Sequence, residues 1–198
     1  MKILGRGWQY TVYDLGNGRV LKKYNSLSIA YMIMLRDCFP YIRDPIWKLP
    51  SYYRGCRETA LSSIKKISDN SLEVWMLANP KVLDDLDYEQ DRVIPIHDYF
   101  QQASSEDGKK IINSFVDFNK RLVANLLIDK SFNITKNFGI DKLGRVVLID
   151  LGELYSSKAG IEQQIKKRIW HSPYVIKPIP TKLRPYFLEK MDDALLTQ

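Results

Sequence analysis

The chain has 198 residues, of which 45% are hydrophobic and 12% aromatic, and it carries a formal net charge of +7. This length and composition favour one domain or one two-lobed unit with a substantial core. Its two cysteines, Cys38 and Cys56, exclude a disulfide framework and fit no metal-binding knuckle, so we expect a cytoplasmic protein. No apolar run reaches about 18 residues and no secretion signal is apparent, so we expect no membrane partner.

Residues 1–24 are predicted to form three strands around a glycine-rich bend. Gly5 and Gly7 lie two positions apart in LGRGWQYTVY, and Val12 follows five positions after Gly7. Glycine lets a backbone approach a phosphate closely, and the amides of such a bend can donate to phosphate oxygens. The third strand reads RVLKKY, and because strand side chains alternate, Lys22 shares a face with the valine of this strand. Lys22 is therefore our candidate for a phosphate contact.

The middle of the chain is predicted to be mostly helical. Residues 26–39 and 57–67 each read as a helix, and residues 88–96 read as a strand that enters a linker at Pro95. The clearest helix covers residues 104–128 and begins with the Ser-x-x-Asp pattern of a capping box. Its apolar face contains Ile111, Phe115, Phe118, Leu122 and Leu126 at helical spacing.

Residues 137–153, NFGIDKLGRVVLIDLGE, predict a short hairpin that ends in an Asp-Leu-Gly turn. A turn at residues 141–144 leads into an apolar run that reads as a buried strand. Because a hairpin brings its two ends together, the amide oxygen of Asn137 and the carboxylate of Asp150 can converge on one cation. Mg²⁺ that carries a nucleotide phosphate prefers a few oxygen ligands of this kind. A buried hairpin with a capped exit turn is the structural alternative.

The C-terminal part is short, because only 48 residues follow Asp150 (198 − 150). Residues 185–196 predict a final helix with one apolar face. Residues 166–168 are basic and precede Trp170 and His171, and aromatic side chains among cations can mark nucleic-acid contact. We favour a solvated helix end for this cluster and do not expect nucleic acid as a partner.

The order of glycine-rich hairpin, lysine strand and Asn–Asp hairpin resembles the protein-kinase-like superfamily, including small bacterial kinase-like proteins that are serine/threonine kinases or pseudokinases. The resemblance implies an α+β, bilobed protein-kinase-like fold. A β-rich N-lobe would cover residues 1–94, and a reduced, mostly helical C-lobe would cover residues 95–198. The two lobes would form one structural unit.

The same resemblance implies ATP and Mg²⁺ as cofactors and assigns roles to individual residues. Gly5, Gly7 and Val12 would cover the nucleotide, and Lys22 would hold its α- and β-phosphates. The oxygen ligands of Mg²⁺ would be Asn137 and Asp150. An acid on a neighbouring helix would pair with Lys22, and both Asp37 and Glu58 are candidates.

The sequence departs from the family pattern at two places. Tyr10 replaces the third glycine of the Gly-rich motif, which makes that bend stiffer. The catalytic Asp of a kinase lies five residues before the metal-binding Asn, and here that position (137 − 5) is Phe132. The nearest acid, Asp129, lies eight residues before Asn137 and could act as the base if the loop bulges by about three residues. An alternative register pairs Asp129 with Asn133.

Three functions remain open from the sequence. The first is an ATP/Mg-dependent phosphotransferase that acts on an unidentified protein or small-molecule acceptor. The second is a pseudokinase that acts as a regulatory or interaction module, with or without bound nucleotide. The third, a basic nucleic-acid-binding domain, is favoured only by the charge and by the cluster at residues 166–171. The chain lacks an Ala-Pro-Glu signature and most of the helices that follow it in kinases, which disfavours folded proteins as acceptors.

Overall fold

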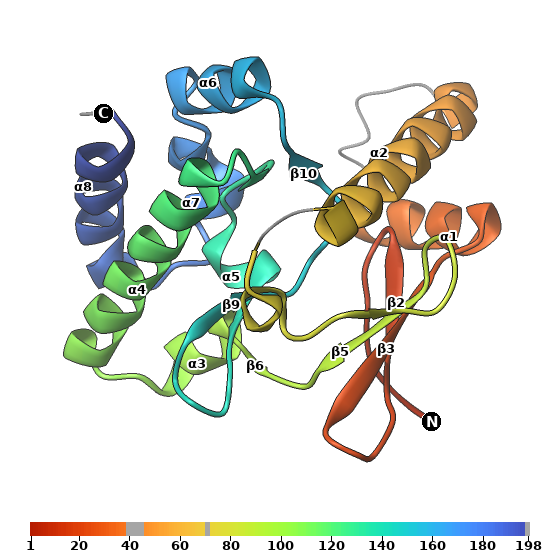
Figure 1. Ribbon diagram of the computed structural model, residues 1–198, viewed down its shortest axis with the longest axis horizontal. Helices are drawn as coiled ribbons and strands as arrows, with labels where there is room; N and C mark the ends of the chain where they lie inside the picture. The colour runs from red at the N-terminus through yellow and green to blue at the C-terminus, as the bar shows by residue number, and fades with distance from the viewer. Residues whose placement is uncertain (39–45, 70–71, 197–198) are drawn as a thin grey trace.

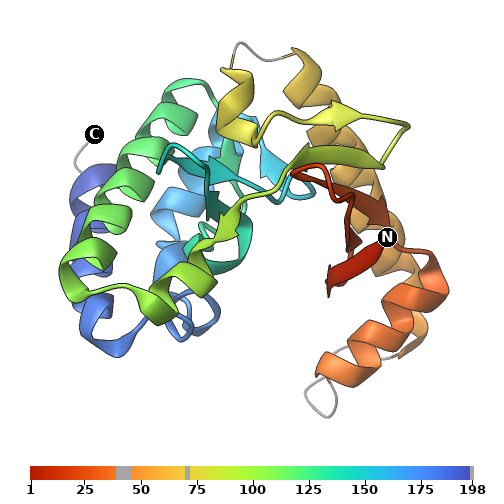
Figure 2. The same ribbon diagram turned by 90° about the horizontal axis from the view of Figure 1, so that it is seen from below.

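The computed structural model of this protein describes residues 1–38, 46–69 and 72–196. The fold is mixed α and β, with an antiparallel sheet in the first half of the chain and mainly helices in the second (Figure 1). Figure 2 shows the sheet and the helices of the first 69 residues on one side of the molecule, and the helices after residue 104 on the other. None of the helices in the described ranges is both long and apolar enough to cross a bilayer.

The larger sheet has the strand order β1-β2-β3-β5-β4, and each neighbouring pair is antiparallel. The three strands predicted for residues 1–24 are confirmed. Lys22 is buried on β3 and Lys23 is exposed, so the predicted inward face of Lys22 is also confirmed. Val12 lies directly opposite Lys22 on the neighbouring strand. The strands are β1 (Lys2–Arg6), β2 (Tyr10–Asp14), β3 (Arg19–Tyr24), β4 (Lys81–Val82) and β5 (Tyr88–Asp91).

Two helices follow the first three strands, lie beside the sheet (Figure 1) and pack against each other. Helix α1 (Leu27–Cys38) lies within the predicted range of residues 26–39. Helix α2 (Leu49–Asp69) begins eight residues before the predicted start at residue 57. The prediction was too short because Pro50 lies in the first helical turn, where proline costs no hydrogen bond. The short 3₁₀ turns η1 (Ile46–Lys48) and η2 (Val74–Leu77) precede and follow α2.

The single strand predicted for residues 88–96 is wrong, because the chain changes partners in the middle of it. Strand β5 pairs with β3 and ends at Asp91, where the amide of Arg92 instead donates to the carbonyl oxygen of Gly18 at 2.9 Å. Strand β6 (Ile94–Pro95) then joins a second sheet with β8 (Phe138–Ile140) and β9 (Val146–Leu148). The predicted boundary between residues 94 and 95 therefore falls inside β6.

Helix α3 (Ile96–Gln102) leads into the long helix α4 (Ser105–Ala124). The predicted cap is confirmed, because Oγ of Ser104 accepts a hydrogen bond from the amide of Asp107 at 3.1 Å. The predicted end at residue 128 is wrong. The chain leaves the helix after Ala124, and Leu126 has a left-handed backbone with φ of 53° and a side chain that is mostly exposed. Leu126 therefore does not belong to the apolar face that the other four residues form.

The C-terminal half surrounds a core that α4 shares with the smaller sheet and the last helix. Phe115 packs edge-on against Phe138 with ring centroids 4.7 Å apart, and α8 packs along α4. The predicted final helix is confirmed as α8. The other elements are β7 (Ile128–Asp129), α5 (Ile134–Asn137), β10 (Leu154–Tyr155), α6 (Lys158–Lys166), η3 (Ile169–His171), α7 (Pro173–Ile176), η4 (Thr181–Leu183) and α8 (Arg184–Leu195).

The basic cluster after α6 is part of this packing. Helix α6 ends at Lys166, as expected for a helix end. The side chain of Trp170 is fully buried, and its Nε1 donates to Oδ1 of Asp192 on α8 at 2.9 Å. Arg168 and His171 contact the same carboxylate. Trp170 is therefore a core residue that joins η3 to α8.

Candidate functional site

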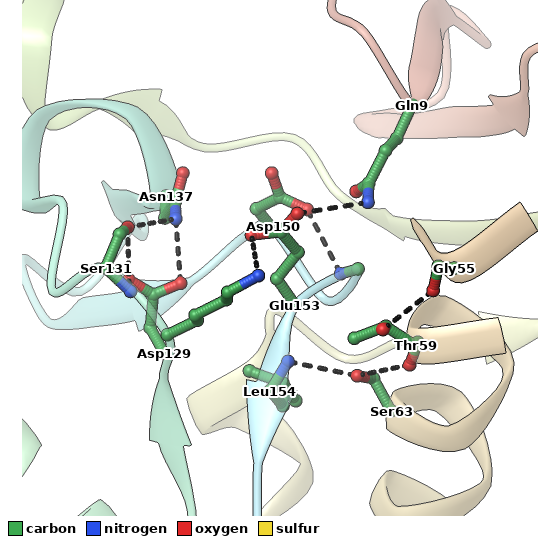
Figure 3. Close-up of polar contacts among 12 residues, drawn as sticks. Gln9, Gly55, Thr59, Ser63, Asp129, Ser131, Asn137, Asp150, Glu153 and Leu154 are labelled. Atoms are coloured by element: carbon green, nitrogen blue, oxygen red, sulfur yellow. Dashed lines mark hydrogen bonds and ion pairs between the residues drawn. The ribbon is translucent and has the colours of Figure 1, made fainter. Parts of the chain in front are cut away.

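The candidate site forms where the segment after β7 meets the segment after β9 (Figure 3). Nδ2 of Asn137 donates to Oδ1 of Asp129 at 2.7 Å. The backbone oxygen of Asn137 accepts from the amides of Ile149 and Asp150 at 2.8 and 3.2 Å. Asn137 therefore contacts Asp129 through its side chain and Asp150 through its backbone. The two ends of the predicted hairpin lie side by side, as the sequence indicated.

The loop between Asp129 and Asn137 bulges in the way the longer spacing requires. Phe132 adopts a left-handed backbone with φ of 52°, and the next residues wind into the helical turn α5. A helical residue advances the chain by only about 1.5 Å, so the turn takes up the extra length. The side chain of Phe132 is fully buried and packs edge-on against Trp170, with ring centroids 5.6 Å apart. Phe132 is thus a core residue.

Asn133 caps the turn α5 instead of facing the hairpin. Its Oδ1 accepts hydrogen bonds from the hydroxyl of Thr135 at 3.0 Å and from the amide of Lys136 at 3.2 Å. An oxygen that satisfies two donors in this way is poorly placed to bind a cation as well. The geometry therefore favours the register with Asn137 over the alternative with Asn133.

Asp129 is a buried carboxyl with several donors around it. Its side chain is 1% exposed, and its Oδ2 accepts from the amide and hydroxyl of Ser131 at 3.2 and 2.9 Å and from the amide of Asn133 at 3.1 Å. Burial raises the pKa of Asp129 to about 6, against the opposing effect of these hydrogen bonds and the one from Asn137. The nearby charge of Asp150 raises this pKa further. The carboxyl therefore keeps its proton to a higher pH than an ordinary aspartate does.

Lys22 reaches the same region from β3. It is 8% exposed, its ammonium donates to the carbonyl oxygen of Ile149, and it lies 5.7 Å from the ring centroid of Tyr88. Burial lowers the pKa of Lys22, while the charge of Asp150 acts in the opposite direction. Lys22 is therefore close enough to Asp150 to feel its charge, although it bonds to the backbone beside it.

Neither acid proposed as the partner of Lys22 is seen to pair with it. Glu58 lies on an exposed position of α2. The side chain of Asp37 lies outside the described residues. Among the residues that are described, Lys22 makes no ion pair, and the carbonyl oxygen of Ile149 takes the place expected for an acid.

Gly152 is required by the close approach of the N-terminal hairpin. A Cβ at this position would lie less than 3.0 Å from Oε1 of Gln9 and 3.1 Å from a ring carbon of Tyr10. Its φ is not among the positive values, so a sharp bend is not the reason for glycine here. The amide of Gly152 donates to Oδ1 of Asp150 at 3.1 Å, which holds that carboxylate over the turn.

Three residues that the sequence did not single out complete the site. Nε2 of Gln9, at the tip of the hairpin, donates to Oε1 of Glu153 at 3.4 Å (Figure 3). Nζ of Lys130 lies 3.8 Å from the other carboxylate oxygen of Glu153. Burial raises the pKa of Glu153, and Lys130 opposes that effect. The contact between Gln9 and Glu153 joins positions 144 residues apart, so no local pattern could have revealed it.

The glycines of the hairpin are not demanded by the fold. A Cβ on Gly5 would meet no atom within 4 Å, and a Cβ on Gly7 would meet only the backbone oxygen of Tyr10 at 3.6 Å. Neither glycine has a positive φ. A side chain at either position would fit the protein alone, so any need for glycine there would come from something that binds against the hairpin.

The described residues contain no preformed metal-binding site of clustered side chains. In the ranges 1–38, 46–69 and 72–196, no three His, Cys, Asp or Glu side chains are grouped to hold an ion. A cation between Asn137 and Asp150 would have two protein side chains as ligands and would need phosphate and water oxygens for the rest. Mg²⁺ with a nucleotide is bound in this way.

Two surface cavities lie outside this cluster. A cavity of about 580 Å³ is lined by Tyr24, Arg57 and the acidic turn 84–87, among others. Another of about 500 Å³ lies behind the linker, between the turns at residues 16–19 and 141–145. Neither is lined by Lys22, Asp129 or Asp150. We place the candidate site by the convergence of charged and amide groups, because volume alone does not provide chemistry.

A comparison with solved structures shows a relative in fold. The structure of Rv3197 from Mycobacterium tuberculosis, in complex with erythromycin, matches with a TM-score of 0.51 and 13% sequence identity. The match covers 98% of this chain and 54% of that protein, so the chain spans about half the length of its structural relative. At this identity the likeness concerns the fold alone. No protein-family model matches the chain, and no curated protein sequence matches it.

Proposed function

We propose that this protein is an ATP- and Mg²⁺-dependent phosphotransferase with a bilobed, protein-kinase-like fold. The observation that carries the proposal is the position of Asn137, whose side chain binds Asp129 and whose backbone binds Asp150. One amide thereby links a candidate base to a candidate metal ligand. Phosphoryl transfer needs little more from a protein than positioning and charge stabilisation, and this cluster can supply both.

In the proposed reaction, Asp150 and the side-chain oxygen of Asn137 would hold Mg²⁺, which would supply positive charge beside the phosphates. Lys22 leaves the carbonyl oxygen of Ile149 and binds the α- and β-phosphates, which places its charge on anions instead of on a neutral acceptor. Asp129 accepts the proton of the acceptor hydroxyl. The new O–P bond forms as the bond between the γ-phosphorus and the bridging oxygen of ADP breaks.

The acceptor is proposed to be a small molecule. Helix α6 begins at Lys158, only eight residues after Asp150 (158 − 150), and β10 uses two of those residues to pair with β7. This segment is too short to form a platform for an extended peptide. The 1% exposure of Asp129 also admits only a narrow hydroxyl group. Both observations favour a small acceptor over a folded protein.

The alternative is a pseudokinase that binds nucleotide without turnover. The observation in its favour is the crowding of Asp129, whose carboxylate already accepts four hydrogen bonds from Ser131, Asn133 and Asn137. A carboxylate has about four acceptor positions in total. As a base, Asp129 would have to release one of these donors when the acceptor arrives.

Thermal unfolding with ATP, with and without Mg²⁺, tests the shared part of both functions. A ligand that binds the native state raises its melting temperature by mass action. We expect a Mg²⁺-dependent rise for the wild type that is lost in Asp150→Ala. Absence of any rise at millimolar ATP would contradict both functions. Steady release of ADP that exceeds an Asp129→Asn control would establish the phosphotransferase, and stoichiometric binding without release would establish the pseudokinase.

A further inference from the structure

The tip of the N-terminal hairpin is held by a single buried residue, Asn25, which follows β3. Asn25 is 3% exposed. Its Nδ2 donates to the carbonyl oxygens of Gly7 and Trp8 at 2.8 and 3.1 Å, and its backbone amide donates to the carbonyl oxygen of Gln9 at 2.7 Å. Three successive carbonyl groups of the tip therefore point toward one residue.

Hydrogen bonds from two neighbouring residues fix the orientation of Asn25. The hydroxyl of Thr11 donates to Oδ1 of Asn25 at 2.6 Å, so Nδ2 is the end that faces the carbonyl groups of the tip. The hydroxyl of Tyr53, on α2, donates to the backbone oxygen of Asn25 at 2.7 Å. Asn25 thus uses its side-chain oxygen, its side-chain nitrogen and both backbone groups, and it is held between α2 and the hairpin.

The planar geometry of the peptide bond determines the direction in which the N–H groups of the tip point. In a planar trans peptide, the N–H points opposite to the C=O of the preceding residue. Because the carbonyl groups of Gly7 and Trp8 point toward Asn25, the N–H groups of Trp8 and Gln9 point away from it on a common side. Among the described residues, neither of these N–H groups has an acceptor. Successive backbone N–H groups with a shared direction form a concavity that suits an anion.

We infer that Asn25 is a positioning residue that aims the amides of Trp8 and Gln9 at the terminal phosphates of the bound nucleotide. This inference rests on the proposed function. It agrees with the place of the tip, because the Gln9 side chain reaches Glu153 and lies against Gly152, two residues beyond Asp150. It also gives Gly7 a role, since a side chain there would crowd an anion and not the protein. A residue outside the glycine-rich motif therefore sets the direction in which the amides of the motif bind phosphate.

The test separates this role from plain stabilisation of the hairpin. Asn25→Asp keeps the size of the side chain but replaces the donor Nδ2 with an acceptor that repels the two carbonyl groups. We would measure the dissociation constants of Mg-ATP and of AMP, which retains the base, the sugar and one phosphate. Asn25→Asp should weaken Mg-ATP at least tenfold and change AMP less than twofold. Thr11→Ser, which keeps the hydroxyl that donates to Oδ1 of Asn25, is the matched control and should weaken Mg-ATP by much less.

Equal weakening of Mg-ATP and AMP, or no weakening of either, would overturn the role of Asn25. If the wild type itself fails to bind Mg-ATP, the proposed function is what fails. A second measurement needs no variant: Mg-ATP should slow hydrogen exchange, or shift the resonances, of the Trp8 and Gln9 amides in the wild type more than AMP does. Binding of Mg-ATP with those two amides unaffected would also overturn the inference.

Discussion

Oγ of Ser63, on α2, accepts a hydrogen bond at 3.0 Å from the backbone amide of Leu154, the second residue after Gly152. The same hydroxyl donates to the carbonyl oxygen of Thr59 one helical turn earlier at 2.9 Å. Ser63 therefore uses both its donor and an acceptor position to tie α2 to β10. The segment that carries Asp150 is held in place by a helix from the other half of the chain.

Ser63→Ala should destabilise the protein by about 1–3 kcal/mol, because it leaves the buried amide of Leu154 without an acceptor. The free energy of unfolding from urea denaturation measures this. Ser62→Ala is the matched control, since Ser62 is the exposed neighbour on the same helix, and its effect should be within about 0.5 kcal/mol. Equal effects of the two variants would show that the Ser63 contact adds nothing.

Asp129 should make the protein less stable as the pH rises from 4 to 7. Its pKa is about 6 in the folded protein against 3.8 for an ordinary Asp, so the folded state binds more protons between these values. The stabilisation is therefore present below pH 4 and is lost as the pH rises through 6, with a span of about 3 kcal/mol.

Unfolding free energies of the wild type and of Asp129→Asn, measured from pH 4 to 7.5, test this dependence. The difference between the two proteins should change with pH in the stated direction. Asp117→Asn, at an exposed position of α4, is the matched control for the loss of one carboxylate. A constant difference between the wild type and Asp129→Asn would contradict the raised pKa.

Lys22 and Lys23 provide a matched pair on one strand. Lys22→Met keeps the length of the buried side chain but removes the charge near Asp150, so it should weaken Mg-ATP binding by tenfold or more. Lys23 is exposed and should tolerate the same substitution with less than a twofold change. Titration of nucleotide binding in the two variants measures this, and equal loss in both would indicate only a general effect of surface charge.

Gly152→Ala should displace Gln9, because the new methyl group needs the space of its side-chain oxygen. We expect a loss of about 1–3 kcal/mol in unfolding free energy, typical of an overpacked site. Gln9→Ala in the same chain should recover most of this loss, which a double-mutant cycle measures. Gly55→Ala, on α2 with no neighbour within 4 Å, should instead stabilise the protein by up to about 1 kcal/mol.

Sequence patterns predicted the parts of the fold that depend on interactions between residues close together in the sequence. Alternation on β3 gave the buried face of Lys22, and the Ser104 cap and the turn at residues 141–144 lie where the sequence placed them. The end of α4 was missed because Leu126 fits the helical period, yet the chain turns to enter β7. Whether such a turn occurs depends on the segment with which β7 pairs, which lies 25 residues later in sequence (154 − 129).

The residues of the candidate site also divide into those that the sequence could predict and those that depend on contacts between distant segments. Asn137 and Asp150 could be proposed from their spacing, because a hairpin joins them. Asp129 was proposed only from the family resemblance, and the bulged loop brings it to Asn137. The roles of Asn25 and Gln9 could not be proposed, since both depend on contacts between the hairpin tip and other segments. An asparagine or glutamine has no periodicity that distinguishes a buried anchor from a surface residue.

Helix α2 holds both sides of the candidate site at once. Tyr53 binds the residue that orients the hairpin tip, and Ser63 binds the strand that follows Asp150. These two residues are ten positions apart (63 − 53) on one continuous helix, which is about 15 Å along its axis. The hairpin and β10 therefore cannot move apart independently while both bonds persist. A ligand or partner that shifts α2 would move the hairpin tip and the segment that follows Asp150 in a single motion.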